Sequence, residues 1–231
     1  MIKICVSGSK GKMGARIIAL AKEDNVGANG RSPLQISGDF DIGTDPEPLI
    51  KGCDCLIEFT APQATMEHLA LCEKYKKAMV IGTTGLSDSE KAGIKAAASK
   101  IPIVFSPNMS IGVNLLFKMM ALATKTLGGE YNIRIDETHH THKKDAPSGT
   151  AKELAAIAGS INADAKIPIN SIREDEIVGD HTVTFESGLD IIKISHSART
   201  RDIFAKGALE ASKFVVGKPP KLYTMQEVLG I

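Results

Sequence analysis

The sequence predicts an α/β fold that begins with a doubly wound parallel sheet and continues into an α+β region with a mixed or antiparallel sheet. In the first half of the 231 residues, short apolar segments alternate with helical segments of about 10–15 residues, which is typical of right-handed βαβ units. A glycine-rich turn separates the first apolar segment from the first helical one. Beyond residue 109 the apolar residues recur with a period of two, as in strands that are buried on one face.

The elements of the first half follow from this alternation. We expect strands and helices, in chain order, at residues 2–7, 13–23, 34–41, 53–59, 62–77, 78–81, 87–100 and 101–105. One helix start is marked clearly, because Ser87 is followed by Glu90 at the spacing of a capping box.

The second half changes its pattern after Asn108. A long helix is expected at residues 110–127, where Gly128 and Gly129 end it. Strands with alternating apolar and polar residues follow at 131–136, 181–186 and 190–197, the last two joined by residues 187–189 as a hairpin. A final helix is expected at residues 201–216, where it would return to the first domain, whereas residues 24–34 carry no such pattern.

Composition excludes several classes of function. The 28 basic and 27 acidic residues leave a net charge of +1, which argues against the broad cationic field of non-specific nucleic-acid binding. No apolar segment approaches the ~18 residues of a membrane span. We therefore expect a cytoplasmic protein with no nucleic-acid or membrane partner.

The four cysteines indicate buried free thiols. Cys5, Cys53, Cys55 and Cys72 lie in apolar segments, and the spacing of Cys53 and Cys55 fits neither a zinc site nor a redox pair.

The glycine-rich turn predicts a dinucleotide site of the Rossmann type. Gly8, Gly11 and Gly14 follow the G-x-x-G-x-x-G spacing, a variant of the dinucleotide fingerprint, between the first strand and the first helix. Glycines there let backbone N–H groups approach a pyrophosphate, and the helix N-terminus adds partial positive charge. A structural turn without a ligand is the alternative.

An acidic residue at the end of the second strand would bind the adenosine ribose. Asp39 and Asp41 are both candidates, and Ile42 rather than a basic residue follows. Carboxylates there would repel a ribose phosphate, which favours NADH over NADPH, although Lys10 or Lys12 could neutralise such a phosphate.

A histidine and lysine cluster is the most informative segment. Three of the six histidines and two lysines fall within residues 139–144, and Ser148 after Pro147 is the expected N-cap of a helix. Cationic side chains beside free helix N–H groups suit an anion, such as a carboxylate, and a histidine beside a lysine suits proton transfer to a C=N or C=C bond. A metal site and a solvated basic loop are the alternatives; the neighbouring lysines would repel a metal cation, so no metal is expected.

On these residues the sequence resembles the 4-hydroxy-tetrahydrodipicolinate reductase (dihydrodipicolinate reductase) family. The resemblance covers nearly the whole chain and is carried mainly by the segment His139-His140-Thr141-His142-Lys143-Lys144-Asp145-Ala146-Pro147-Ser148-Gly149-Thr150-Ala151. Further motifs stand in family order at residues 8–14, 82–85, 108–114, 177–183 and 204–208. Lys12, Glu58 and Phe214 depart from the residues that are common in the family, and the region of the second strand is shortened.

The resemblance implies a Rossmann dinucleotide-binding domain at residues 1–109 and 202–231, and a substrate-binding and oligomerisation domain at residues 110–201. It also implies NAD(P)H-dependent reduction and dehydration of a cyclic imine dicarboxylate to tetrahydrodipicolinate, in the diaminopimelate route to lysine, by a homotetramer. A reductase of another diacid and a non-catalytic dinucleotide-binding sensor are the alternatives.

The resemblance also assigns residues to roles. It implies that His139 and Lys143 are catalytic. The substrate-binding residues that it implies are His140, Ser148, Gly149 and Thr150. The cofactor-binding residues that it implies are Gly8, Ser9, Lys10, Gly11, Lys12, Met13, Asp41, Gly82, Thr83, Thr84, Ser106, Pro107, Asn108 and Met109.

Overall fold

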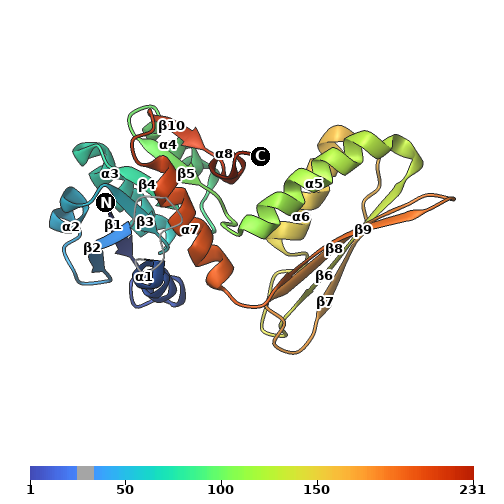
Figure 1. Ribbon diagram of the computed structural model, residues 1–231, viewed down its shortest axis with the longest axis horizontal. Helices are drawn as coiled ribbons and strands as arrows, with labels where there is room; N and C mark the ends of the chain where they lie inside the picture. The colour runs from blue at the N-terminus through green and yellow to red at the C-terminus, as the bar shows by residue number, and fades with distance from the viewer. Residues whose placement is uncertain (25–33) are drawn as a thin grey trace. The chain divides into compact units, whose positions relative to one another are not determined.

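The computed structural model describes residues 1–24 and 34–231, and it divides into two compact units (Figure 1). The N-terminal unit contains residues 1–110 and 204–230, and the inserted unit contains residues 111–203 together with residue 231. Most of the unpatterned segment at residues 24–34 lies outside the described residues.

The N-terminal unit is built on a six-stranded parallel sheet with the strand order β10-β5-β4-β3-β1-β2. Its strands are β1 (Ile2–Ser7), β2 (Leu34–Phe40), β3 (Cys55–Glu58), β4 (Ala78–Ile81), β5 (Pro102–Phe105) and β10 (Lys221–Tyr223). Every residue of β3 and β4 is buried, because central strands of a doubly wound sheet are covered on both faces.

Helices cover both faces of this sheet and form two separate cores. They are α1 (Lys12–Asp24), α2 (Glu47–Gly52), α3 (Pro62–Tyr75), α4 (Asp88–Ala97), α7 (Asp202–Val215) and α8 (Met225–Leu229). One core packs α1, α7 and α8 against the sheet, and the other packs α2, α3 and α4 (Figure 1). This arrangement confirms the predicted doubly wound α/β fold.

Local signals in the sequence located most of these elements. Ser87 caps α4 and forms the predicted capping box with Glu90. Three short elements of the N-terminal unit had no prediction: α2, β10 and α8, which have 6, 3 and 5 residues. Segments this short carry too little periodicity to be recognised.

The inserted unit packs two helices, α5 (Ile111–Leu127) and α6 (Gly149–Ile161), on one face of a four-stranded sheet (Figure 1). The strand order is β7-β6-β8-β9, with β6 (Asn132–His139), β7 (Ile169–Arg173), β8 (Gly179–Glu186) and β9 (Ile191–Ala198). The 3-10 helix η1 (Gly128–Glu130) follows α5. Because β7 runs parallel to β6 and the other pairs are antiparallel, the sheet is mixed, as predicted.

Burial along β6 explains which side chains reach the interior of the inserted unit. Ile133, Ile135, Glu137 and His139 alternate with more exposed neighbours, which extends the predicted alternation to the end of the strand. Two of these four inward positions are ionisable, and they lie at the end of β6 that leads to the His/Lys segment.

Two further expectations concern the chain as a whole. All four cysteines are free and buried, as predicted. Within residues 1–24 and 34–231, no helix is both long and apolar enough to cross a membrane.

Candidate active site

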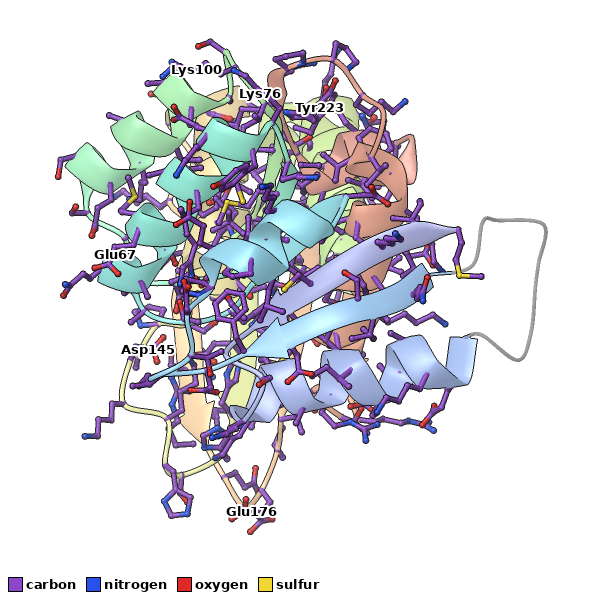
Figure 2. The ribbon with its side chains drawn as sticks, turned by 90° about the vertical axis from the view of Figure 1, so that its left-hand side faces the viewer. Glu67, Lys76, Lys100, Asp145, Glu176 and Tyr223 are labelled. Atoms are coloured by element: carbon purple, nitrogen blue, oxygen red, sulfur yellow. The ribbon has the colours of Figure 1, made fainter. Side chains whose placement is uncertain are left out.

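A cavity of about 720 Å³ opens in the N-terminal unit where β1, β2 and β3 end. Its lining comes from the loop after β1, the segment between β2 and α2, and the start of α3, including Glu67 and His68. Figure 2 labels Glu67 on the part of α3 that borders this cavity, and Lys76 beyond the other end of the helix. Ligands of open α/β sheets bind at this carboxyl edge.

The predicted glycine loop forms one wall of the cavity. Gly8 has a φ of +69°, and a Cβ on Gly14 would lie 2.2 Å from the carbonyl oxygen of Gly8. The amide of Gly11 donates to the same carbonyl oxygen at 2.9 Å, so the loop is tightly wound as it enters α1. Side chains would block this winding, and their absence lets a ligand approach the backbone.

Asp41 lies beside this loop and lines the cavity. Its carboxylate accepts hydrogen bonds from the amides of Lys10 and Ile42, both at 2.8 Å. These backbone hydrogen bonds hold the pKa of Asp41 below its usual value. Asp39, the other candidate, is exposed on β2.

The remaining predicted cofactor residues fall on the turns that follow β4 and β5. A Cβ on Gly82 would lie 2.2 Å from the ring of Phe59, and Thr83 is buried beside it. The turn after β5 is held by Ser106, whose Oγ donates to the carbonyl oxygen of Asn108 at 2.7 Å. Because both turns leave the same edge of the sheet as the glycine loop, one extended ligand can span them.

The predicted catalytic histidine lies in the inserted unit, in a hydrogen-bonded network centred on Glu137. Glu137 and His139 point to the same face of β6, and His139 Nδ1 is hydrogen-bonded to Glu137 Oε2. The other carboxylate oxygen, Oε1, accepts from Arg173 Nη2 at 3.0 Å and from the amide of Ser148 at 3.3 Å. Glu137 is therefore hydrogen-bonded to His139 through one carboxylate oxygen and to the start of α6 through the other.

Burial and hydrogen bonding together determine the pKa values of the ionisable groups in this network. Burial lowers the pKa of His139, and this effect outweighs the opposing effect of Glu137, which raises it. Burial raises the pKa of Glu137, but hydrogen bonds from Arg173 and His139 bring it below its usual value. Burial also lowers the pKa of His181, 5.0 Å from His139 between ring centroids, to about 4. Both imidazoles are thus poised as neutral groups beside a carboxylate.

Gly179 lies beside the Nε2 edge of the His139 ring. A Cβ on Gly179 would lie 2.9 Å from His139 Nε2, closer than real Cβ atoms come. Because Nδ1 is occupied by Glu137, Nε2 is the nitrogen left for a ligand or for proton transfer.

The predicted catalytic lysine is held by a neighbouring carboxylate. Lys143 Nζ contacts both oxygens of Asp145, at 2.7 and 2.9 Å, and this contact lowers the pKa of Asp145. Arg173 also fixes this loop, because its guanidinium donates to the carbonyl oxygens of Lys143 and Asp145.

The predicted substrate-binding residues stand at the start of α6 and just after β6. Ser148 is the N-cap of α6, as predicted: its Oγ accepts from the amide of Ala151 at 3.2 Å, and it also contacts His181 Nε2 at 3.1 Å. Gly149 and Thr150 open the first turn of α6. Among the residues that the structure describes, none is hydrogen-bonded to the buried Nδ1 of His140. A helix N-terminus and an unsatisfied imidazole are each suited to a carboxylate.

Glu137, His139 and His181 also offer ligand atoms that lie within 4.8 Å of one another, which a metal ion could bridge. The carboxylate oxygens are already engaged, and Arg173 contacts one of them. A guanidinium at this distance opposes a second cation. The arrangement is therefore better described as a hydrogen-bonded network than as an open ligand set.

Three residues of this network received no role from the sequence: Glu137, Arg173 and His181. Glu137 could have been found from its spacing, because residues two apart on a strand share a face. Arg173 and His181 reach the site through strand pairing, opposite His139 and Glu137. No local pattern shows this register.

Comparison with known proteins gives matches along the whole chain. Residues 2–109 match the family described as dihydrodipicolinate reductase, N-terminus, and residues 112–229 match dihydrodipicolinate reductase, C-terminus. The 4-hydroxy-tetrahydrodipicolinate reductases of Geobacter metallireducens and Geobacter sulfurreducens are 39% and 38% identical to it, over 100% of this chain and 100% of each relative.

Solved structures show the same fold. The dipicolinate-bound dihydrodipicolinate reductase from Paenisporosarcina sp. TG-14 has a TM-score of 0.79 at 23% identity, covering 98% of both chains. A probable dehydrogenase from Thermotoga maritima has a TM-score of 0.64 at 13% identity, covering 98% of this chain and 92% of the other.

Proposed function

Because the chain belongs to the dihydrodipicolinate reductase family, we propose that it catalyses the NAD(P)H-dependent reduction of 4-hydroxy-tetrahydrodipicolinate to tetrahydrodipicolinate, in which the 4-hydroxyl group leaves as water. One observation in the structure supports this activity most directly. Glu137 is hydrogen-bonded both to His139 and to the amide of Ser148, so a proton-transferring imidazole lies beside a helix N-terminus that suits a carboxylate.

The cofactor would occupy the cavity of the N-terminal unit. The tight winding at Gly8 and Gly14 leaves room for a pyrophosphate against the backbone, and the volume of about 720 Å³ suits part of a dinucleotide. Asp41 would bind the ribose hydroxyls, and the turns at residues 82–84 and 106–109 would border the nicotinamide. When bound, a reduced nicotinamide supplies the hydride for the reaction.

The cationic groups of the inserted unit would bind and activate the substrate. His140 and the backbone amides of Gly149 and Thr150 would hold a carboxylate of the dicarboxylate ring. Lys143 would deliver a proton to the ring of the substrate. Before substrate binds, the ion pair with Asp145 holds the lysine ammonium in place, and a substrate carboxylate would compete with Asp145 for the ammonium. His139 would exchange a proton through Nε2, since Glu137 holds Nδ1.

The cofactor preference follows from charge near the ribose. The Asp41 carboxylate is fixed by two backbone amides, and the Ile42 side chain that follows is 99% exposed and carries no charge. A 2′-phosphate would meet this carboxylate, so we expect NADH to be preferred over NADPH.

The inserted unit would also carry the oligomer contacts. Its sheet is covered by α5 and α6 on one face, while Arg134, Lys193 and Ser195 on the other face are exposed. An open sheet face of this kind suits pairing with a second copy, in keeping with the homotetramer that we propose.

The four free cysteines fit a reducing compartment, and the cytoplasmic location stays a prediction.

The decisive test is loss of nicotinamide absorbance with freshly generated 4-hydroxy-tetrahydrodipicolinate, run in parallel with NADH and NADPH. We expect turnover with both and a higher kcat/KM with NADH. Binding of NADH without turnover of this substrate would refute the activity and leave a reductase of another diacid or a dinucleotide-binding sensor. Thermal protection by pyridine-2,6-dicarboxylate together with NADH would separate the proposed reductase from the sensor, because the sensor has no use for a dicarboxylate.

A further inference from the structure

A second buried carboxylate, Glu58, lies under the cavity of the N-terminal unit and has no role in the mechanism above. Glu58 is the last residue of β3, and its side chain has an exposed fraction of 0%. A buried carboxylate is costly unless several donors satisfy it. Its partners therefore show what it holds in place.

Four side chains converge on its two oxygens. Oε2 contacts Ser7 Oγ and His68 Nδ1, both at 2.7 Å. Oε1 contacts the Thr60 hydroxyl and, at 3.4 Å, the Thr65 hydroxyl. Ser7, Thr60 and His68 can each donate to the carboxylate. The single hydroxyl proton of Thr65 is shared among Glu58, Thr83 Oγ1 at 2.9 Å and the carbonyl oxygen of Ala61 at 3.1 Å.

These partners belong to different walls of the cavity. Ser7 directly precedes Gly8 of the glycine loop, whereas Thr60 and His68 line the cavity. Because His68 Nδ1 points to the buried Glu58, its other ring nitrogen is the one left to face a ligand.

The network also reaches the turn after β4. Thr65 Oγ1 lies 2.9 Å from Thr83 Oγ1, and the amide of Thr60 donates to Thr83 Oγ1 at 3.3 Å. Thr83 therefore shares its hydrogen bonds with two of the residues that Glu58 orients. A dinucleotide on a doubly wound sheet spans the ends of β1 and β2 with one half and the ends of β4 and β5 with the other.

We propose that Glu58 is a positioning residue that couples the two halves of the dinucleotide site, acting through His68 on the adenosine side and through Thr65 and Thr83 on the nicotinamide side. The proposal rests on the dinucleotide site of the proposed function. Glu58 touches no ligand itself; it keeps both walls in the binding conformation, which lowers the cost of ordering them when the cofactor binds.

The test measures the Kd of NADH by titration, independently of turnover, in wild type and in Glu58→Gln. The amide keeps the size of the side chain but removes the charge and one acceptor, so we expect the Kd to rise at least tenfold. At saturating NADH, kcat should fall by a smaller factor than the Kd rises, because saturation refills the weakened site. Glu73→Gln, which removes a surface carboxylate of α3, is the matched control and should leave the Kd unchanged.

A double-mutant cycle separates coupling from a general loss of structure. If Glu58 acts through His68, then His68→Asn should raise the Kd much less in the Glu58→Gln background than in wild type. The same comparison with Thr83→Val reports on the nicotinamide side. Multiplicative effects in both cycles, or an unchanged Kd in Glu58→Gln, would overturn the proposal.

Two further comparisons keep the outcome decisive. If Glu58→Gln does not fold, Ser7→Ala and Thr65→Val each remove one donor and leave the carboxylate in place, and each should still raise the Kd at least threefold. An unchanged Kd in both would overturn the proposal. Wild-type protein that binds neither NADH nor NADPH would instead refute the dinucleotide site, and with it the proposed function.

Discussion

Replacing Glu137 by glutamine tests whether this carboxylate controls His139. The side chain of Glu137 is fully buried, and Arg173, 19% exposed at its side chain, lies 3.0 Å from Oε1. A hydrogen bond to a charged group contributes ~1.5–3 kcal/mol, and the amide oxygen of glutamine retains one acceptor. We therefore expect the free energy of unfolding to fall by about 2 kcal/mol.

The effect on catalysis follows from the charge of the histidine. Glu137 raises the pKa of His139 against the effect of burial, so its neutralisation lowers that pKa further. The imidazole then lacks the carboxylate that favours its protonated form. Since general acid–base catalysis contributes ~10²–10⁴-fold, we expect kcat to fall roughly 10- to 100-fold. The limb of the profile of kcat against pH that reports His139 should move to lower pH.

Steady-state kinetics between pH 5 and 9, with NADH saturating, would measure both effects. Glu186→Gln is a matched control, because Glu186 lies exposed at the far end of β8. Glu137→Asp keeps the charge and should retain more activity than the glutamine variant. A Glu137→Gln enzyme with kcat within twofold of wild type and an unmoved pH profile would refute the reasoning.

Three further predictions concern single side chains. Lys143→Ala should lower kcat at least 100-fold in the reductase assay, whereas Lys144→Ala, which changes its exposed neighbour, should stay within about threefold. The pKa of His181 is about 4 in the folded protein against 6.5 for an ordinary histidine. As the pH falls, the unfolded state therefore binds the proton first, and the protein loses about 3 kcal/mol of stability through this group between pH 6.5 and pH 4. Urea unfolding at pH 7 and at pH 4 should show a smaller loss of stability in His181→Gln than in wild type. Asp41→Asn should raise the ratio of kcat/KM for NADPH to that for NADH about tenfold, measured in parallel assays, while Asp39→Asn should leave it nearly constant.

Structural features that depend on residues close together in the chain could be predicted from the sequence. The capping box of Ser87 and Glu90, the N-cap at Ser148 and the alternation along β6 each depend on side chains a few residues apart. The doubly wound sheet followed from repeated strand and helix periods in the same way. Such signals survive because local hydrogen bonding and the side-chain period of an element do not depend on the rest of the fold.

The networks around the two buried carboxylates could not be predicted in this way. Glu137 meets Arg173 and His181 only because β7 and β8 pair with β6 in one particular register. Glu58 meets Ser7 because β1 and β3 are neighbours although 51 residues separate the two side chains. The whole sheet determines which strands are neighbours and in which register they pair. A single sequence therefore shows which ionisable residues are present, but it does not show which of them are in contact.

The interrupted course of the N-terminal unit also constrains how the protein is made. Residues 111–203 are continuous in the chain, so the inserted unit can close its core as soon as the ribosome has released them. At that point the N-terminal unit still lacks β10, which pairs with β5, and α7, which packs closely against Met109. The packing is so close that a Cβ on Gly207 of α7 would lie 1.7 Å from the carbonyl oxygen of Met109. During synthesis, therefore, the edge of β5 and the part of the sheet face that α7 and α8 cover stay exposed until residues 204–230 emerge, and this interval is when the nascent protein has most need of protection from aggregation.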